Sequence, residues 1–406
     1  MGILDFKITA RANGSLARAG TLTLKHGKIE TPEFIVVGTK ATVKAIDPAM
    51  LKDIGVQVTL ANTYHLWLRP GEDIVAGQGG LHDFMAWDGP MVTDSGGFQA
   101  FSLGYALEHG VGKLIDNFGD KDWFKKKKPI KPKLARIDDE GITFRSHLDG
   151  SSLRLTPERS IDIQEKLGAD IILVLDECTS PVSDYEYTRR SLERTHRWAE
   201  QCLEAHKTDQ ALAGIAQGGE WHDLRIKSAE FLASLPFDSY AIGGSLGKSK
   251  ADMLQVLEWT NQILPEEKPR HLLGIGSLED IFESVERGVD LFDCILPTRL
   301  ARMGIALVGP RSGGCFKNRW RMQINASMAE DSRPLDPHCS CPTCRRFSRS
   351  YIRHLQKSGE MLGHTLVSVH NVAFMMDLMR QIRAALAAGT FQELKHYWLE
   401  PACVKA

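Results

Sequence analysis

Residues 271–296 read HLLGIGSLEDIFESVERGVDLFDCIL, an apolar run, a capped helical segment and a second apolar run. Ser277 and Asp280 have the spacing of a capping box, with Asp in place of the usual Glu, and Gly288 supplies a helix stop signal. Strand, helix and strand in such close succession form the βαβ unit of a parallel sheet. This stretch therefore predicts an α/β fold.

The same alternation extends along most of the 406-residue chain. Helix start signals such as Asp47–Pro48 and Thr156–Pro157 stand between short apolar runs. Eight of these runs are expected to be strands: Phe34–Val37, Val56–Ala61, Met91–Thr93, Ile171–Leu175, Ala211–Ala216, Tyr240–Ile242, His271–Ile275 and Leu291–Leu296. Eight strands that alternate with helices predict a (β/α)8 TIM barrel, which needs about 250 residues and tolerates insertions. We assign residues 1–312 to this catalytic barrel.

Two regions interrupt the barrel pattern. An insertion spans about residues 103–155. Its second half, residues 137–152, alternates polar and apolar residues and predicts a small antiparallel hairpin, whereas its first half contains the Lys125–Lys128 run. Residues 313–406 are expected to form a helical subdomain packed on the barrel. The helices expected there are residues 347–361 and 371–388.

Composition limits the functional class. The net charge of −1, with 43% hydrophobic and 25% charged residues, is that of an ordinary globular protein. Because we find neither a signal peptide nor a run of about 18 apolar residues, we expect a cytoplasmic enzyme without a membrane partner. Residues 294–329 nevertheless hold six Lys or Arg residues and no acid, which favours contacts with phosphate groups.

Three cysteines near the C-terminus have the C-x-C-x-x-C spacing of a metal site: Cys339, Cys341 and Cys344. Without an export signal, thiols or metal ligands are expected rather than disulfides. A tetrahedral site needs one more ligand, and a zinc ion with four protein ligands is structural rather than catalytic. Candidates for the fourth ligand are His354, His364 and His370. The motif predicts one structural zinc ion per chain.

Polar residues or paired glycines follow five of the expected strands. They are Asp94–Gln99, Asp176–Cys178, Gln217–Gly219, Gly243–Gly244 and Asp293–Cys294. In (β/α)8 barrels the carboxyl ends of the strands carry the catalytic residues. One Asp after a strand often only caps the next helix, but several carboxyl groups at one rim indicate an active site. Bare glycines let a flat ligand approach the backbone closely.

Five motifs, in this order, resemble the tRNA-guanine transglycosylase family of bacterial type: TDSGGFQ (93–99), LDEC (175–178), GIAQGG (214–219), AIGG (241–244) and DLFDCILPTR (290–299). The likeness extends from about residue 31 to residue 370. It implies a zinc-bearing barrel enzyme, a pentosyltransferase without an organic cofactor. Such an enzyme exchanges the wobble guanine (position 34) in the tRNA anticodon loop for a 7-deazaguanine during queuosine biosynthesis.

The resemblance implies a role for two carboxyl groups. Asp293 matches the nucleophile that attacks C1′ of the ribose, and Asp94 matches the general acid/base for the leaving and incoming bases. Base exchange with retained configuration requires two inversions, and hence a covalent aspartyl-ribose intermediate. The chemistry therefore agrees with the roles that the resemblance assigns.

The resemblance also assigns residues that bind the base. Asp176, Gln217 and the Gly244 backbone match groups that read the purine edge. Phe98 and Leu273 match the pair that sandwiches the ring, where the family often has Tyr and Met.

Two further implications concern the tRNA and the metal. Arg299 and Arg302 match arginines that contact the tRNA beside the target nucleotide. The family pattern places the zinc-binding histidine 26 positions after the last cysteine, at residue 370, which selects His370 as the fourth ligand. Family members are commonly dimers, so we expect a homodimer.

The incoming base is expected to be the small 7-deazaguanine preQ1, because Cys178 is typical of preQ1 enzymes. Gly247 stands where such enzymes have Val and would leave room for the larger queuine, and Ser249 replaces their Glu. A queuine-salvaging enzyme is therefore one alternative. The other is a non-catalytic tRNA-binding partner subunit, against which the retained Asp94 and Asp293 argue.

Overall fold

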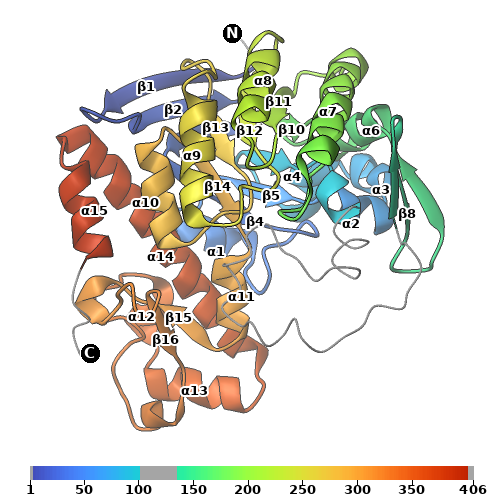
Figure 1. The fold of residues 1–406 in the computed structure, drawn as a ribbon. Coiled ribbons are helices and arrows are strands. Elements are labelled where there is room, and N and C mark those ends of the chain that lie inside the picture. Colours follow the sequence, from blue (N-terminus) through green and yellow to red (C-terminus); the bar gives the residue numbers. More distant parts are fainter. Residues whose placement is uncertain (1–2, 101–134, 401–406) are drawn as a thin grey trace. The chain divides into compact units, whose positions relative to one another are not determined.

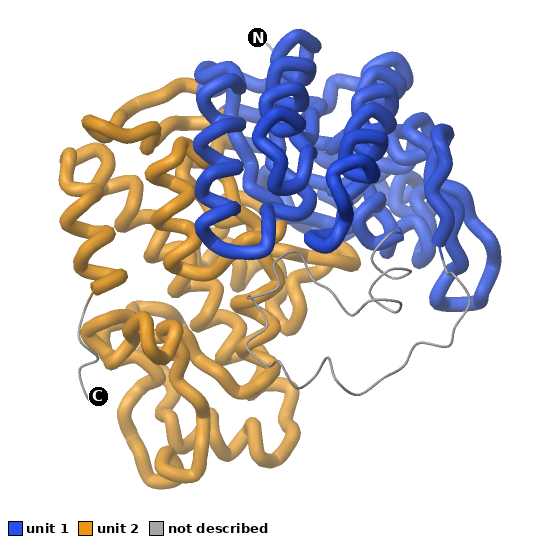
Figure 2. Tube along the Cα trace, viewed as in Figure 1, with its two compact units in different colours: residues 1–6, 23–27, 60–273 blue, residues 7–22, 28–59, 274–406 orange. Residues whose placement is uncertain are grey.

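A computed structural model describes residues 3–100 and 135–400. The chain forms two compact units, coloured separately in Figure 2. Unit 1 comprises residues 1–6, 23–27 and 60–273, and unit 2 comprises residues 7–22, 28–59 and 274–406. The Lys125–Lys128 run of the insertion lies outside the described residues.

Eight strands form a closed barrel in the order β10-β11-β12-β13-β14-β4-β5-β6 (Figure 1), which confirms the predicted fold class. They are β4 (Glu33–Val37), β5 (Thr59–Ala61), β6 (Met91–Thr93), β10 (Ile171–Leu173), β11 (Ala211–Ala216), β12 (Ser239–Ile242), β13 (Arg270–Leu272) and β14 (Leu291–Cys294). The pairs β10–β11, β11–β12, β12–β13 and β14–β4 are all parallel. Four strands are shorter than expected, since β5 begins only at Thr59, and β10, β13 and β14 end at Leu173, Leu272 and Cys294.

The helices of unit 1 begin where the sequence carries start signals. The Thr156 side chain accepts a hydrogen bond from Arg159 N at the start of α6, and Ser249 and Asp252 form a complete capping box at the start of α9. These N-caps fix the residue at which each of the two helices begins. The helices of unit 1 that lie wholly within the described residues are α2 (Thr63–Leu68), α3 (Glu72–Gly77), α4 (Gly80–Met85), α6 (Pro157–Leu167), α7 (Tyr185–Ala205), α8 (His222–Ala233) and α9 (Lys250–Asn261). Residues 97–100 are helical as well.

The insertion contributes a small antiparallel sheet to unit 1. β7 (Ala135–Asp138) and β8 (Gly141–Arg145) form the expected hairpin around Glu140–Gly141. A third strand, β9 (Ser152–Leu155), pairs with β8 and completes the sheet before α6 begins. The inward residues Ile142, Phe144 and Leu155 are buried, so the sheet has an apolar face.

Unit 2 contains β4, β14 and a set of helices that ends the chain. The Asp47 side chain caps α1 (Pro48–Asp53), and that of Ser277 caps α10 (Leu278–Glu286). α11 (Leu296–Arg302) starts two residues after β14, because Pro297 near its N-terminus favours the helical backbone there. The remaining elements are β15 (Ile305–Leu307), β16 (Arg321–Gln323), α12 (Pro342–Arg346), α13 (Arg349–Lys357), α14 (Met361–Ala388) and α15 (Phe391–Leu399).

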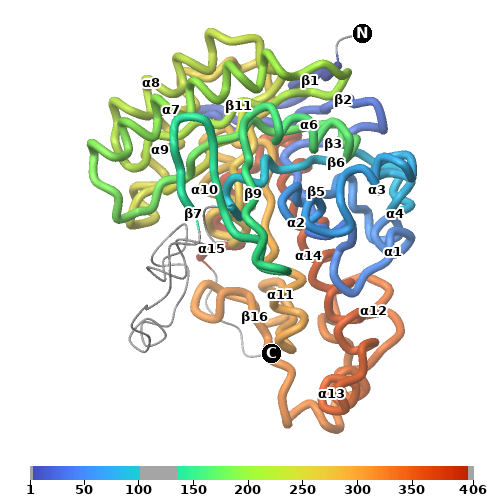
Figure 3. Tube along the Cα trace, turned by 90° about the vertical axis from the view of Figure 1, so that its right-hand side faces the viewer, coloured from blue at the N-terminus to red at the C-terminus, as the bar shows by residue number. Residues whose placement is uncertain are grey.

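The long helix α14 corrects one expectation. We placed its start at residue 371, with His370 just ahead of it, but α14 begins at Met361 and His370 lies in its interior. α14 packs against α11, α12 and α13, and Figure 3 shows it extending alongside α12 and α13. Leu366, Val367 and Val369 are buried in these contacts, which stabilise the first turns of the helix.

Two further features belong to the N-terminal part of the chain. β1 (Asp5–Arg11), β2 (Arg18–Leu24) and β3 (Gly27–Thr31) form a three-stranded sheet. Within unit 2, the buried Arg18 guanidinium donates two hydrogen bonds to the Asp290 carboxylate just before β14. None of the helices in the described parts of the chain is long and apolar enough to span a membrane.

Candidate active site and metal centre

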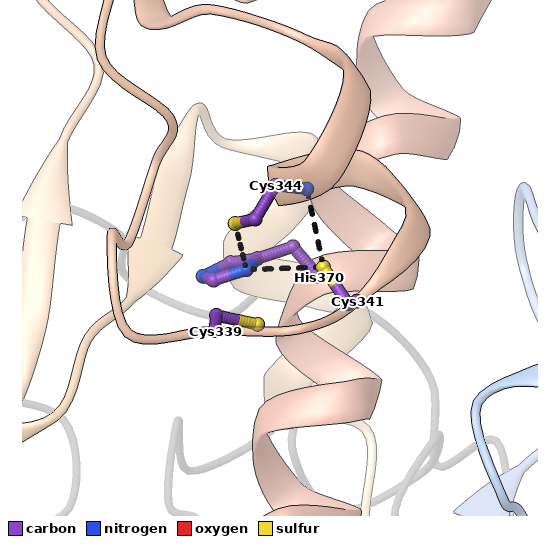
Figure 4. Close-up of side chains that lie close together, drawn as sticks. All are labelled: Cys339, Cys341, Cys344 and His370. Carbon is purple, nitrogen blue, oxygen red and sulfur yellow. Dashed lines mark hydrogen bonds between the residues drawn. The ribbon is translucent and has the colours of Figure 1, made fainter.

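Three thiols and one imidazole converge in unit 2 (Figure 4). Cys339 lies in a loop, Cys341 is the N-cap of α12, Cys344 lies within α12, and His370 comes from α14. Their candidate ligand atoms all lie within 4.8 Å of one another. The structure therefore brings together the four residues that the sequence and the resemblance assigned to zinc.

The separations suit a tetrahedral metal ion. His370 Nδ1 lies 3.3 Å from Cys344 Sγ and 3.7 Å from Cys341 Sγ. With Zn–S and Zn–N bonds of about 2.3 and 2.0 Å, the edges of a tetrahedron joining S and N are about 3.5 Å long. Three sulfurs and one nitrogen are a typical structural zinc set, so these residues can hold a metal ion without an open coordination position.

The imidazole of His370 is oriented by a backbone group. Its Nε2 lies 2.7 Å from the Leu307 carbonyl oxygen, to which it donates. That bond places the proton on Nε2 and leaves the Nδ1 lone pair facing the thiols, as a metal ligand requires. Hydrogen bonding with Cys339 and Cys344 lowers the pKa of the Cys341 thiol, so the cluster favours a thiolate at this position.

Asp94, the expected general acid/base, is held by the loop after β5. The Thr63 N–H donates to Asp94 Oδ1 at 2.9 Å, and the Asn62 side-chain amide donates to Oδ2. The Thr63 hydroxyl donates to the Asp94 carbonyl oxygen at 2.5 Å. The carboxyl group directly after β6 is thus fixed in direction while its side chain stays partly exposed.

The expected base-reading residues of unit 1 lie together. The buried Gln217 side chain donates from Nε2 to Asp176 Oδ2 at 2.5 Å. A Cβ atom on Gly244 would lie 1.9 Å from Gln217 Oε1, so only glycine permits the backbone to pass this close. Within the described residues, Gln217 Oε1 is buried and accepts no hydrogen bond. A purine edge has the donors that such an acceptor requires.

Leu273 joins this group, and the segment that carries Phe98 lies close to it. A Cβ atom on Gly243 would contact Leu273 Cδ1 at 3.5 Å, and Leu273 N donates to the Ile242 carbonyl oxygen. The turn that carries Phe98 approaches Asp176, because a Cβ atom on Gly97 would lie 3.1 Å from the Asp176 carbonyl oxygen. Phe98 itself is partly exposed, as a ring that stacks on a ligand would be.

Asp293, the expected nucleophile, belongs to unit 2. It lies in β14, one residue before the strand ends, and is partly exposed. Its Oδ1 accepts a hydrogen bond from the Gly274 N–H at 2.8 Å. The opposing strand is β4, with Asp293 in register with Ile35. A partly exposed carboxylate of this kind is chemically able to act as a nucleophile.

The two expected tRNA-binding arginines lie on α11, which follows Asp293. Arg299 is exposed, whereas Arg302 is partly buried and donates to the Thr298 carbonyl oxygen at 2.8 Å. Burial, and repulsion by the neighbouring Arg299, lower the pKa of Arg302. Two guanidinium groups this close favour an anionic partner such as a phosphate.

Asn371 links the metal centre to that helix. It follows His370 on α14 and is fully buried. Its side-chain amide donates to the carbonyl oxygens of Pro297 and Ile305, both at 3.0 Å, and its Oδ1 accepts from Leu307 N at 2.8 Å. The turn of α14 that supplies a metal ligand therefore also anchors the N-terminal part of α11.

A second cluster of potential metal ligands lies in unit 1. His26 Nδ1 is 2.8 Å from Asp170 Oδ1, His82 Nε2 is 3.3 Å from Asp170 Oδ2, and the two imidazole rings stack at 3.6 Å. Asp170 also accepts hydrogen bonds from the N–H groups of His26 and Met91. Because Asp170 precedes β10, at the amino end of the strand, we interpret the cluster as a stabilising hydrogen-bond network.

Gly247 has a structural reason to be glycine. Its φ is +94°, and a Cβ atom there would lie 2.2 Å from Asp252 Cβ, in the capping box of α9. The missing side chain thus follows from the local backbone. The room for a larger base that we inferred from Gly247 is therefore a weak argument for queuine.

Sequence reasoning missed the residues that support this site. Asn62 and Thr63 hold Asp94, and Arg225 and Ser228 of α8 bond to the turns around Gln217 and Gly244. Asn62 carries a detectable signal, because an Asn after an apolar run is a typical N-cap, and it caps α2. Arg225 carries none, because an Arg within a helix is usually solvated.

The comparison with known proteins agrees with these arrangements. The family model "Queuine tRNA-ribosyltransferase" matches residues 13–402. A "Putative queuine tRNA-ribosyltransferase" of Archaeoglobus fulgidus is 51% identical over 387 residues, covering 94% of this chain and 96% of the relative. The "Queuine tRNA-ribosyltransferase" of Roseiflexus sp. is 47% identical, covering 98% of this chain and 99% of the relative. That of Staphylococcus aureus is 45% identical, covering 95% of this chain and 93% of the relative. The chain belongs to the queuine tRNA-ribosyltransferase family.

Proposed function

We propose that this chain is a tRNA-guanine transglycosylase, a pentosyltransferase that replaces the wobble guanine (position 34) of the tRNA anticodon by the 7-deazaguanine preQ1. Family membership supports the reaction class. The finer assignment rests on the residues themselves, since each candidate catalytic or base-reading residue lies in a barrel strand or within a few residues of its end. In a (β/α)8 barrel that is where catalytic residues stand.

The observation that carries the proposal is the Asp176–Gln217–Gly244 group. The Gln217 amide nitrogen donates a hydrogen bond to Asp176, while Gln217 Oε1 is buried without a donor among the described residues. A buried acceptor without a donor costs about 1–3 kcal/mol, so it favours a ligand that supplies one. Guanine and 7-deazaguanines both present N–H donors on one edge, and both are flat enough for a glycine-lined wall.

The reaction would proceed in two displacements. Asp293 attacks C1′ of the ribose while the bond from C1′ to the guanine nitrogen breaks, and protonated Asp94 supplies the proton that the leaving guanine takes. Asp94, now a carboxylate, then removes the proton from the incoming base. That base attacks C1′ and releases Asp293. Each step inverts C1′, so the overall configuration is retained.

Other residues would bind and support rather than react. Arg299 and Arg302 would contact phosphates beside the target nucleotide, which must leave the stacked anticodon loop to reach the site. A zinc ion on Cys339, Cys341, Cys344 and His370 would stabilise the fold of unit 2, since a closed set leaves no position for substrate. We also propose a cytoplasmic homodimer, as the family resemblance implies.

An exchange assay with an active-site variant tests the proposal. Pure wild-type protein should incorporate labelled guanine into an anticodon stem-loop and form a denaturation-resistant tRNA complex. Asp293→Asn should lose both activities while binding tRNA with wild-type affinity, because an amide keeps the shape but is a poor nucleophile. A covalent complex in the Asn variant would show that Asp293 is not the nucleophile.

The two alternative functions have their own outcomes. A non-catalytic partner subunit would bind tRNA without exchanging guanine. Cys178, which is buried, supports preQ1 as the incoming base because preQ1 enzymes typically have Cys at this position. A queuine-salvaging enzyme would instead incorporate queuine at least as fast as preQ1 in a side-by-side assay. Since a hydrophobic pocket discriminates one methylene by only about 1–3 kcal/mol, slow use of the disfavoured base is expected in either case.

A further inference from the structure

A buried arginine stands behind the base-reading turns of unit 1. Arg225 lies in the first half of α8 and has no solvent exposure. Its guanidinium donates to four backbone carbonyl oxygens, those of Gly219 (2.8 Å), Ala216 (3.0 Å), Gly243 (3.2 Å) and Ser245 (2.8 Å). Carbonyl groups, rather than a carboxylate, thus receive all four of these bonds.

Stability alone is a poor reason for this arrangement. Burial lowers the pKa of Arg225 to about 9, so the group remains a cation at neutral pH and its charge must be desolvated. Charged hydrogen bonds to carbonyl dipoles offset part of that cost. Apolar residues often replace buried charges without loss of stability, so the guanidinium is better explained by the geometry that it imposes.

The four carbonyl groups flank the two base-reading positions. Ala216 and Gly219 lie on either side of Gln217, and Gly243 and Ser245 lie on either side of Gly244. Ser228, one turn further along α8, accepts a hydrogen bond from Gln217 N at 3.1 Å. One helix therefore fixes both the turn that follows β11 and the turn that follows β12.

Holding a carbonyl group also fixes the amide on the other side of the same peptide. Because the peptide bond is planar and trans, the Gly243 carbonyl determines where the Gly244 N–H points, and the Ser245 carbonyl determines where the Leu246 N–H points. Gly244 itself passes within contact distance of Gln217 Oε1, because a Cβ atom there would lie 1.9 Å from that oxygen. The bonds from Arg225 thereby set the direction of a backbone donor at the residue next to the unpaired acceptor.

We propose that Arg225, assisted by Ser228, is a positioning residue that preorganises both turns for the purine base. The inference rests on the proposed function, since it takes Gln217 and Gly244 as the base-reading groups. Preorganised polar groups bind their ligand without first paying the entropy of ordering, so their loss weakens base binding more than it slows chemistry. The step affected is binding of the purine base, not the contacts with tRNA phosphates.

Arg225→Lys is the central variant, because it keeps the charge but a single ammonium cannot reach four carbonyl groups in two turns. The KM for the free base should rise about tenfold, the effect of weakening one charged hydrogen bond, with kcat and tRNA affinity unchanged. Amides of residues 216–219 and 243–247 should also exchange with deuterium faster than in wild type. Ser228→Ala, a milder change, should raise the KM for the base in the same direction.

Arg270→Lys is the matched control. Arg270 is equally buried in unit 1 and donates to the Leu264 carbonyl oxygen, but it lies at the amino end of β13. It should match Arg225→Lys in any general loss of thermal stability while keeping the wild-type KM for the base. Unchanged KM in both Arg225→Lys and Ser228→Ala would overturn the inference.

The outcomes separate this inference from the proposed function. A wild-type protein that exchanges no guanine refutes the function and the role of Arg225 toward a base. If the wild type exchanges guanine but the KM for the base is unchanged in both Arg225→Lys and Ser228→Ala, only the positioning role is refuted. Should Arg225→Lys fail to fold, Ser228→Ala alone decides between the two results. Wild-type deuterium exchange in both turns of Arg225→Lys would also count against the positioning role.

Discussion

Replacing His370 by Ala should deprive the protein of its metal ion and loosen the end of unit 2. The imidazole is fully buried, faces Cys341 and Cys344 through Nδ1, and donates to the Leu307 carbonyl oxygen through Nε2. Ala removes the fourth ligand and also leaves that carbonyl group without its donor. Both effects act on the same turn of α14, so they should appear as one loss of stability.

The size of the effect can be worked out from the two contributions. Metal binding to a four-ligand structural zinc site contributes roughly 10–16 kcal/mol of folding free energy, so an equal share for one ligand, the least that the variant should lose, is about 2.5–4 kcal/mol. A buried carbonyl group without a donor costs about 1–3 kcal/mol more. At roughly 2–4 °C per kcal/mol for a domain of this size class, the melting temperature should fall by about 10 °C or more.

Metal content and thermal unfolding together check this prediction. Wild-type protein should contain one zinc ion per chain, and His370→Ala well under one. A cavity of about 630 Å³ borders Cys339 and Cys341, so a chelator can reach the cluster and should destabilise wild type but hardly affect the variant. The matched control is His364→Ala on the same helix, which should keep its zinc. Full zinc occupancy in His370→Ala, with loss in His364→Ala, would refute the ligand assignment.

Two further predictions concern the tRNA and acid stability. Arg299→Ala should weaken tRNA binding and reduce the slope of log affinity against log salt by about one unit for each phosphate that the arginine neutralises in the wild-type complex, as measured by titrations at several salt concentrations. An unchanged slope would assign Arg299 to packing. Burial alone would raise the pKa of Asp170, but hydrogen bonds from His82, Met91 and His26 outweigh it and hold the pKa below its usual value. The Asp170 carboxylate therefore contributes to stability above about pH 4, and this contribution disappears as the pH falls through the lowered pKa. In Asp170→Asn, the free energy of unfolding measured with urea should then fall less steeply with decreasing pH than in wild type. An equally steep fall in both proteins would contradict this prediction.

The barrel could be predicted because its signals are local. Thr156 and Ser249 cap the helices that the sequence marks with start signals, and Asp47 does the same for α1. Each apolar run between such signals is buried on both faces, as a parallel strand requires. Local capping and apolar runs therefore agree with the final fold along most of the chain.

The start of α14 could not be predicted for the opposite reason. Gly363, Thr365 and Val367 have low helix propensity, so nothing local indicates a helix before residue 371. Burial of Leu366 and Val367 against α12 and α13 overrides that preference. Packing partners distant in sequence decide such a segment, and a single sequence does not name them.

The same limit applies to the supports of the active site. Asp94, Asp176, Gln217 and Gly244 are visible in the sequence because they follow apolar runs as motifs. Arg225 is 9 residues from Ala216 but 20 from Ser245, and its role depends on α8 lying beneath both turns. Chemistry at strand ends can therefore be read from local patterns, whereas the groups that hold it in place emerge only from the packing.

The metal centre also helps to hold α11 in place, which its ligand set alone does not suggest. His370 and Asn371 are adjacent on α14, and Asn371 holds Pro297 at the start of α11, the helix that carries Arg299 and Arg302. Metal binding that fixes this turn of α14 therefore also fixes α11, and with it the two guanidinium groups that we assign to tRNA. Asp94 and Gln217, by contrast, belong to unit 1. Zinc loss should accordingly weaken tRNA binding before it alters recognition of the free base.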